Sequence, residues 1–318
     1  MSLALLFPGQ GVQHETMLAW LDAPVHPPAH PDAGAAAAAA ASALSALAAS
    51  LGANWRARLR DATWAHSNAV AQCLITGVSL AAWQRLAPHL PRPVAVAGYS
   101  VGELAAAAAA GVFDATAAQQ LARQRAAAMD ACAARSAGGL LALTGVSSAA
   151  VDALCARFGL SVAIRIGADR CVLGGPLAAL AAAEAAGVAA GAHCVVLRVQ
   201  VASHTPAMGA AARDFAAGIA ALPWQSATCV MATNLDGRGR RDAAALKHAL
   251  AQQLAHTVHW DRCMDTLAER RPRCVLEVGP GTSLARMWAA RHPDVPVRSV
   301  DEFHSAQAVL AWTLQALG

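Results

Sequence analysis

Short apolar runs bounded by glycine or proline alternate along this chain with longer amphipathic or alanine-rich stretches. Continuous apolar runs are typical of buried strands, whereas apolar positions that recur at intervals of three and four predict helices. Leu3–Phe7 and Val94–Ala97 are the clearest strand signals early in the sequence. Further strands are expected over residues 228–233 and 273–278, and helices over residues 35–50, 54–58, 68–86 and 114–135. This alternation predicts an α/β fold with a mostly parallel sheet covered on both faces.

Two segments interrupt the alternation. Residues 22–34 hold four prolines and two histidines and predict a surface loop. Between residues 137 and 199 the order becomes strand, helix, strand, strand, helix, strand, with elements expected over 139–144, 149–158, 161–166, 171–173, 177–190 and 193–199. This βαββαβ order is that of the ferredoxin-like unit. The sequence therefore predicts a large domain from residues 1–136 and 200–318, with residues 137–199 inserted as a small subdomain.

Composition removes several classes of protein. Charged residues make up 14% of the chain and the net charge is +4, and the few arginine clusters have no interleaved aromatic residues, so nucleic-acid binding is not expected. The eight cysteines are dispersed without metal-ligand spacing, which is typical of buried free thiols in a reducing compartment, and we expect no metal site. The alanine runs contain few leucines, and the seven residues before Pro8 are too short for a signal peptide. We therefore expect a soluble, cytoplasmic protein without a membrane partner.

The pentapeptide Gly98-Tyr99-Ser100-Val101-Gly102 stands between an apolar run and a strong helix former. In that context the Gly-x-Ser-x-Gly pattern is typical of a nucleophile elbow, a sharp turn that holds the serine oxygen at the start of a helix. Free N–H groups and the helix dipole favour negative charge there. The alternative is a glycine-rich turn with an incidental serine.

A serine nucleophile needs a base, and His204 is the best candidate among the twelve histidines. It lies just before a predicted helix, where the chain returns to the large domain. The other histidines fall in predicted loops or on helix faces, where a solvated or structural role is the default.

An ordered set of motifs along essentially the whole chain resembles the malonyl-CoA:acyl-carrier-protein transacylase family. These motifs are Phe7-Pro8-Gly9-Gln10-Gly11-Val12-Gln13, Gly98–Glu103, Gln124-Arg125 with Met129, Ser203-His204, Asn234, Gln253-Leu254 with Val258 and Trp260, and Glu277–Gly281. The resemblance implies an α/β-hydrolase-like large domain with mostly parallel sheet and an inserted ferredoxin-like subdomain. Each motif alone is weak evidence for the family. The inference rests on the occurrence of all of them in the same order.

The resemblance also implies roles for individual residues. Ser100 would be the nucleophile and His204 the general base and acid, while the backbone N–H groups of Gln10 and Val101 would form the oxyanion hole. Arg125 would bind the free carboxylate of the malonyl group through a bidentate pair; without the resemblance, a surface arginine on an amphipathic helix would be the default.

Gln253 would orient the histidine through a backbone carbonyl instead of an acid, and Met129 would support the site. In keeping with this, no third carboxylate stands out: Glu103 and Glu277 are better interpreted as local structural acids.

The chain departs from the family pattern in two places. Tyr99 replaces the usual histidine before the nucleophile, and the asparagine often found in the strand-turn-strand of the insert is absent near Ile166-Gly167-Ala168. In addition, Met17–Leu21 and the proline-rich stretch after it resemble the malonate decarboxylase epsilon subunit, which loads malonyl onto a dedicated carrier subunit.

The leading hypothesis is thus a malonyltransferase of the acyl-carrier-protein S-malonyltransferase type. Malonyl-CoA would be its substrate, an acyl carrier protein or a malonate decarboxylase carrier subunit with a phosphopantetheine-type thiol would be its partner, and no cofactor would be permanently bound. A transacylase of fatty-acid or polyketide synthesis is the closest alternative. A serine esterase or thioesterase would have no need of Arg125 and usually keeps a triad acid. A non-catalytic carrier-binding scaffold predicts loss of Ser100 or His204, and both are present.

Overall fold

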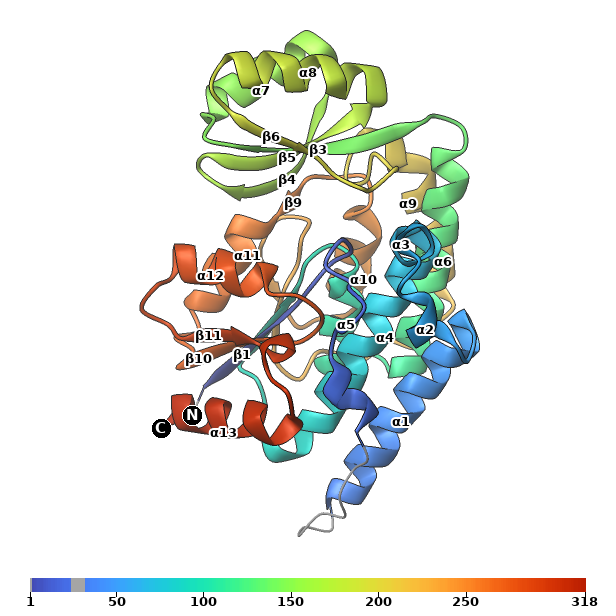
Figure 1. Cartoon of the computed structure of the whole chain (residues 1–318), viewed down its shortest axis with the longest axis vertical. Helices are drawn as coiled ribbons and strands as arrows, with labels where there is room; N and C mark the ends of the chain where they lie inside the picture. The colour runs from blue at the N-terminus through green and yellow to red at the C-terminus, as the bar shows by residue number, and fades with distance from the viewer. Residues whose placement is uncertain (1, 24–31) are drawn as a thin grey trace.

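The computed structural model describes residues 2–23 and 32–318 of the chain. Most of the surface loop expected over residues 22–34 therefore lies outside the described residues, and helix α1 (Asp32–Leu51) already includes its last three positions. Figure 1 shows two stacked parts: a large α/β part that carries both termini, and a smaller sheet with two helices over it.

The large part is built on a six-stranded sheet with the order β11-β10-β1-β2-β7-β8. Its strands are β1 (Leu3–Phe7), β2 (Ala95–Gly98), β7 (Val230–Ala232), β8 (Gly239–Arg240), β10 (Cys274–Glu277) and β11 (Val297–Ser299). The first five strands in this order are parallel, and only β8 pairs antiparallel. The expected mostly parallel sheet is confirmed.

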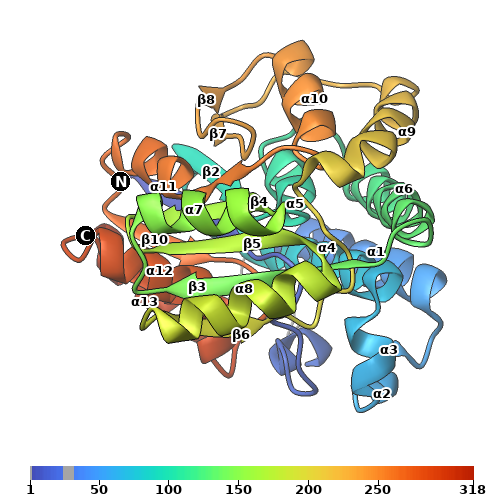
Figure 2. The same ribbon diagram turned by 90° about the horizontal axis from the view of Figure 1, so that it is seen from above.

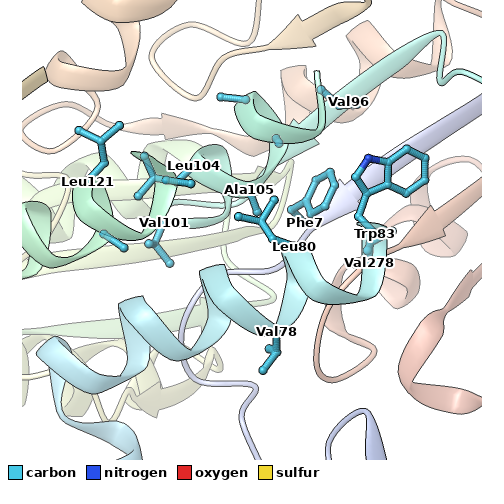
Figure 3. Packing of buried hydrophobic residues seen from close by; sticks show 14 of the residues in the cluster. Phe7, Val78, Leu80, Trp83, Val96, Val101, Leu104, Ala105, Leu121 and Val278 are labelled. Atoms are coloured by element: carbon cyan, nitrogen blue, oxygen red, sulfur yellow. The ribbon is translucent and has the colours of Figure 1, made fainter. Parts of the chain in front are cut away.

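Alternate side chains of the central strands enter two different cores, as the period of two in a strand requires. Leu5 and Phe7 belong to the core shared with helices α4 (Asn68–Leu86), α5 (Gly102–Ala109) and α6 (Ala115–Ala133). Part of this core is drawn in Figure 3, where Phe7 lies between Leu80 and the helix that follows Ser100. Ala4 and Leu6 face the opposite core, with α11 (Trp260–Ala268) and α12 (Ser283–Arg291). Because both faces are covered, the strands are almost wholly apolar.

The small sheet has the order β6-β3-β5-β4-β9. Strands β3 (Gly138–Thr144), β4 (Ser161–Gly167), β5 (Arg170–Pro176) and β6 (His193–Val196) pair antiparallel, and α7 (Ser148–Phe158) and α8 (Leu177–Ala189) lie over one face, as Figure 2 shows from above. This is the strand order of the expected ferredoxin-like unit. Strand β9 (Val258–His259) from the later part of the chain pairs with β4. The division at residues 137 and 199 stays a prediction.

Two strands in this region have wrong boundaries in the sequence-based prediction. Strand β5 runs over Arg170–Pro176 and is longer than the expected residues 171–173, because its pairing with β3 continues to Pro176. Strand β6 ends at Val196, whereas the apolar pattern extends it to residue 199. The N–H of Leu197 still donates to the Leu140 carbonyl at 2.9 Å, and the chain then leaves the sheet edge toward His204. Residues 197–199 are apolar or long because they line a cavity, not because they continue the strand.

The remaining elements pack around the large part of the chain, most of them against other helices. They are helices α2 (Trp55–Arg58), α3 (Ala62–His66), α9 (Gly209–Ala220), α10 (Ala243–Gln252) and α13 (Ala306–Leu317), and 3-10 turns η1 (Ala19–Asp22), η2 (Ala87–His89), η3 (Pro206–Met208) and η4 (Val300–Glu302). None of the helices in the described ranges is long and apolar enough to span a bilayer. All eight cysteines are free thiols, and six of them are buried.

Candidate active site

The turn between β2 and α5 puts Ser100 in the left-handed region, at a φ of 55°. Glycine is required on both sides of it because the backbone is crowded: a Cβ on Gly98 would overlap the backbone of Gly102, and a Cβ on Gly102 would overlap the carbonyl of Phe7. Ser100 therefore lies beyond the carboxyl end of the interior strand β2, at the start of helix α5. This is the elbow geometry that the Gly-x-Ser-x-Gly pattern predicts.

His204 lies on the segment that leads from the small sheet back to the large part of the chain, and its ring contacts Ser100. Its Nε2 lies 2.8 Å from Ser100 Oγ, and its Nδ1 lies 2.7 Å from the backbone carbonyl of Gln253. A carbonyl can only accept, so Nδ1 carries the proton and Nε2 presents its lone pair to the serine hydroxyl. Burial lowers the pKa of His204 to about 3, and the positive charge of Arg125 acts in the same direction. The imidazole is therefore neutral near pH 7 and able to accept a proton.

Neither buried glutamate takes the place of a triad acid. Glu103 accepts the Asn234 N–H at 2.8 Å, and Glu277 accepts the N–H groups of Leu284 and Ala285 at 3.2 and 2.8 Å, where it ties β10 to α12. Burial raises the pKa of each carboxyl to about 8. Their contacts are those of local structural acids, and the histidine is oriented by a backbone carbonyl instead.

Arg125 reaches the nucleophile from α6 and is only 1% exposed. Its Nη2 donates to Ser100 Oγ at 3.2 Å and to Gln253 Oε1 at 3.3 Å, while Nη1 donates to Gln72 Oε1 at 2.8 Å and to Met129 Sδ at 3.2 Å. Burial lowers the pKa of the guanidinium to about 10, against the opposing effect of the Glu103 charge. Even so, the group remains cationic near pH 7. Within residues 2–23 and 32–318 it forms no ion pair.

A buried arginine that is held only by neutral groups destabilises the fold unless an anion joins it. Because Arg125 is buried, its interpretation as a surface residue of an amphipathic helix is wrong. Met129 also lies where the resemblance puts it, because its sulfur accepts hydrogen bonds from both Arg125 and Gln72.

A cavity of about 410 Å³ opens above Ser100 and His204. The loop after β1 forms one wall with Gln10, and α12 forms another with Met287. The small sheet closes the top with the apolar side chains of Leu140, Ile164, Val195 and Val196, and the segment after β6 adds Leu197, Arg198 and Val199. Such a lining suits an acyl thioester with an uncharged arm more than a strongly polar ligand.

The two backbone amides expected to form an oxyanion hole are free. Gln10 lies in the loop after β1, and Val101 directly follows the serine at the start of α5. In the described part of the chain neither N–H has a hydrogen-bond partner. They are available to an oxygen bound between Ser100 and the β1 loop.

Sequence reasoning missed two residues of the site. Gln72 is fully buried on α4 and accepts a hydrogen bond from Arg125, but nothing in its local pattern separates it from a core position. Asn234 was noted only as one position of a motif. In the structure its Oδ1 accepts the Ser100 N–H at 2.8 Å and its Nδ2 donates to the Gly98 carbonyl at 2.7 Å.

Of the two departures from the family pattern, only Tyr99 lines the cavity. The Tyr99 ring packs edge-on against Trp260 at 5.2 Å and lines the cavity beside Ser100. Ile164 of β4 lines it from the small sheet, two positions before the stretch that lacks the asparagine. No group of three or more potential metal ligands occurs in residues 2–23 and 32–318.

Comparison with known proteins gives a consistent result. No family model matches the chain. The malonyl CoA-acyl carrier protein transacylase of Mycobacterium tuberculosis strain H37Rv is 35% identical over 302 residues, which cover 94% of this chain and 96% of that protein. The crystal structure of MCAT from Mycobacterium tuberculosis has a TM-score of 0.84 at 32% identity and covers 100% of both chains. The malonyl-CoA:acyl carrier protein transacylase of Xanthomonas oryzae has a TM-score of 0.86 at 27% identity, with 98% of this chain and 99% of that chain covered.

The chain belongs to the malonyl-CoA:acyl-carrier-protein transacylase family.

This transacylase family assignment confirms three expectations from the sequence. The family resemblance is correct, the fold is the α/β fold of the solved transacylases, and the class of enzyme is the acyl-carrier-protein S-malonyltransferase. The roles of individual residues and the identity of the carrier stay predictions.

Proposed function

We propose that this transacylase moves a malonyl group from malonyl-CoA to the thiol of an acyl carrier protein through a malonyl ester of Ser100. The observation that carries the proposal is the contact between Arg125 Nη2 and Ser100 Oγ at 3.2 Å. In a malonyl ester, a single methylene separates the ester carbonyl from the free carboxylate. A buried, cationic guanidinium beside the ester oxygen is therefore well situated to bind that carboxylate.

In the first half-reaction, Ser100 Oγ attacks the thioester carbonyl while its proton passes to His204 Nε2. The carbonyl oxygen becomes negative and accepts the N–H groups of Gln10 and Val101. The C–S bond then breaks, and CoA leaves as the thiol with the proton from His204. The ester bond to Ser100 has replaced the thioester bond to CoA.

In the second half-reaction, the carrier thiol gives its proton to His204 Nε2 and attacks the ester carbonyl. The C–O bond to Ser100 breaks and the serine oxygen regains the proton. A new thioester forms on the carrier, so the bonds and protons balance without a cofactor or metal. The apolar roof of the cavity supports this route because it suits the uncharged pantetheine arm that both thiols share.

For the carrier, we propose the carrier subunit of malonate decarboxylase, on the resemblance of Met17–Leu21 to the epsilon subunit. All of these residues except Ala19 are buried, and Trp20 Nε1 donates to the Val300 carbonyl at 3.1 Å. The buried side chains would not touch a carrier themselves, so only a direct assay bears on this point. A carrier of fatty-acid or polyketide synthesis is the alternative.

The test compares transfer of labelled malonyl from malonyl-CoA to two purified carriers, one from malonate decarboxylase and one from fatty-acid synthesis. We expect kcat/KM at least tenfold higher for the decarboxylase carrier. A preference for the fatty-acid carrier would reject the carrier assignment and keep the transferase. Hydrolysis of malonyl-CoA without transfer to any carrier thiol would reject the transferase.

A further inference from the structure

The side chain of Asn234 forms hydrogen bonds to the turn that carries Ser100, and its backbone groups are paired as well. Its Oδ1 accepts the Ser100 N–H at 2.8 Å, and its Nδ2 donates to the Gly98 carbonyl at 2.7 Å. Its own N–H donates to Glu103 Oε1 at 2.8 Å, and its carbonyl accepts the N–H of His259 at 2.9 Å. The residue is fully buried. One carboxamide therefore joins the end of β2 to the proposed nucleophile from a position 134 residues away.

The turn needs such a support because its geometry is strained. Ser100 has a φ of 55°, and a non-glycine residue is strained in this region, so its surroundings must hold it there. The glycines on either side provide room for the turn, and the Gly102 N–H donates to the Tyr99 carbonyl at 3.0 Å, but no backbone carbonyl accepts the N–H of Ser100. An unpaired Ser100 N–H inside the protein would add the free-energy cost of a buried donor without an acceptor. The side chain of Asn234 removes that penalty only while the turn keeps its present shape.

We propose that Asn234 is a positioning residue of the transacylase: it holds the elbow so that Ser100 Oγ faces His204 and the Val101 N–H stays free. Glu103 anchors it, because this buried carboxyl group on the first turn of α5 accepts the Asn234 N–H through Oε1. This hydrogen bond connects the end of β7 to helix α5. Asn234 acts through Ser100 and does not contact the substrate. The inference rests on the proposed role of Ser100, but not on selectivity for malonyl.

The neighbouring Thr233 offers a matched control. It is also buried, at 1% exposure, and it stands at the same strand end. Its hydroxyl bonds to Asp236 Oδ1 and to the Arg238 carbonyl, both at 3.3 Å, in the turn that leads to β8. Loss of this hydroxyl removes buried hydrogen bonds near the elbow without altering the elbow itself.

The experiment compares Asn234→Asp, Asn234→Ala and Thr233→Val with the wild type. Aspartate has the size of asparagine and keeps an acceptor for the Ser100 N–H, but it sets an oxygen against the Gly98 carbonyl. Two rates are measured: the burst of acylation by malonyl-CoA, and inactivation by phenylmethylsulfonyl fluoride, which reports on serine reactivity without the malonyl carboxylate. Because small displacements of a reacting group cost up to about 10²-fold, both rates should fall about 10- to 100-fold in the Asn234 variants.

The KM for malonyl-CoA should stay within twofold, since the contacts of Arg125 are untouched, and Thr233→Val should react at nearly the wild-type rate. Rates are divided by the folded fraction, taken from near-UV circular dichroism below the melting temperature of each variant. Wild-type rates in folded Asn234 variants, or an equal slowing in Thr233→Val, would overturn the positioning role. A wild-type protein whose Ser100 takes up neither reagent would instead overturn the proposed function.

Discussion

The two sheets contribute to one cavity in different ways. The large part of the chain supplies polar groups that hydrogen bonds hold in place: Ser100 through Asn234, His204 through Gln253, and Arg125 through Gln72. The small sheet supplies only apolar side chains over the same cavity, and those of β6 are half-exposed at its mouth.

The difference follows from what each region must do. Proton transfer and carboxylate binding depend on the orientation of the reacting groups and on tenths of an ångström in their separation. Each catalytic side chain therefore needs hydrogen-bond partners that hold it in place. The arm of a thioester needs an apolar slot, which tolerates substitution. Changes in the first region should therefore alter rates by large factors, and changes at the mouth by small ones.

The largest effect is expected at His204. Replacement by alanine removes the proton acceptor of both half-reactions, which typically costs about 10²- to 10⁴-fold. Stopped-flow acylation and single-turnover transfer to a carrier give the two rates separately. If both stay near normal, another base serves Ser100 and the comparison of the two regions loses its main support.

Arg125 should show the next largest effect, on the choice of acyl group. A charge-assisted bond to a carboxylate contributes about 1.5–3 kcal/mol, so Arg125→Ala should lower the malonyl-to-acetyl ratio of kcat/KM by about 10- to 100-fold. Arg125→Lys should restore it only in part, because an ammonium cannot form the bidentate pair. Equal losses for malonyl-CoA and acetyl-CoA would mean that Arg125 supports the fold and binds no carboxylate.

The pH dependence of acylation should lack the usual histidine step. Burial disfavours the imidazolium and lowers the pKa of His204 to about 3, so the free base persists at pH 5. For an ordinary histidine with a pKa near 6.5, the fraction of neutral imidazole would fall about 20-fold between pH 7 and pH 5. We expect the burst rate to fall less than twofold over this range. An inflection of the burst rate between pH 6 and 7 would mean that water solvates the imidazole and that the pKa of His204 is not lowered.

The smallest effect is expected at the mouth. Val196 is 52% exposed on β6 and lines the cavity, whereas Leu177 is equally exposed on α8 and does not. Since a buried CH₂ contributes about 0.8 kcal/mol, Val196→Ser should raise the KM of the carrier by about two- to fivefold. Leu177→Ser is the control and should leave the KM unchanged. A loss of more than tenfold at Val196 would show that the small sheet does more than accommodate the arm.

The parts of the site that could be predicted are those with a local signature. The elbow at Ser100 requires glycine on both sides, and that requirement is visible in five consecutive residues. The place of His204 before a predicted helix made it the best candidate for the base, but its role rested on the family resemblance, because one histidine before a helix has many other uses. Arg125 could be recognised only through the resemblance, because one arginine on a helix also has many other uses.

Other parts depend on contacts between distant segments. Gln72 resembles any core position of α4 until α6 packs against it. The strands β8 and β9, with two residues each, are too short to carry a period. Strand β6 ends early because the chain turns to bring His204 to Ser100. This turn depends on a contact between distant residues, and a local run of apolar residues carries no information about it.

The most direct test of the central claim is the mass of the protein after incubation with malonyl-CoA alone. We predict that the wild type gains one malonyl group in a burst, that peptide mapping finds it on Ser100, and that a carrier thiol removes it. Ser100→Ala, with the same charge and nearly the same size, should gain no mass. An adduct of equal size on Ser100→Ala, or a wild type that transfers malonyl without any adduct, would contradict the account.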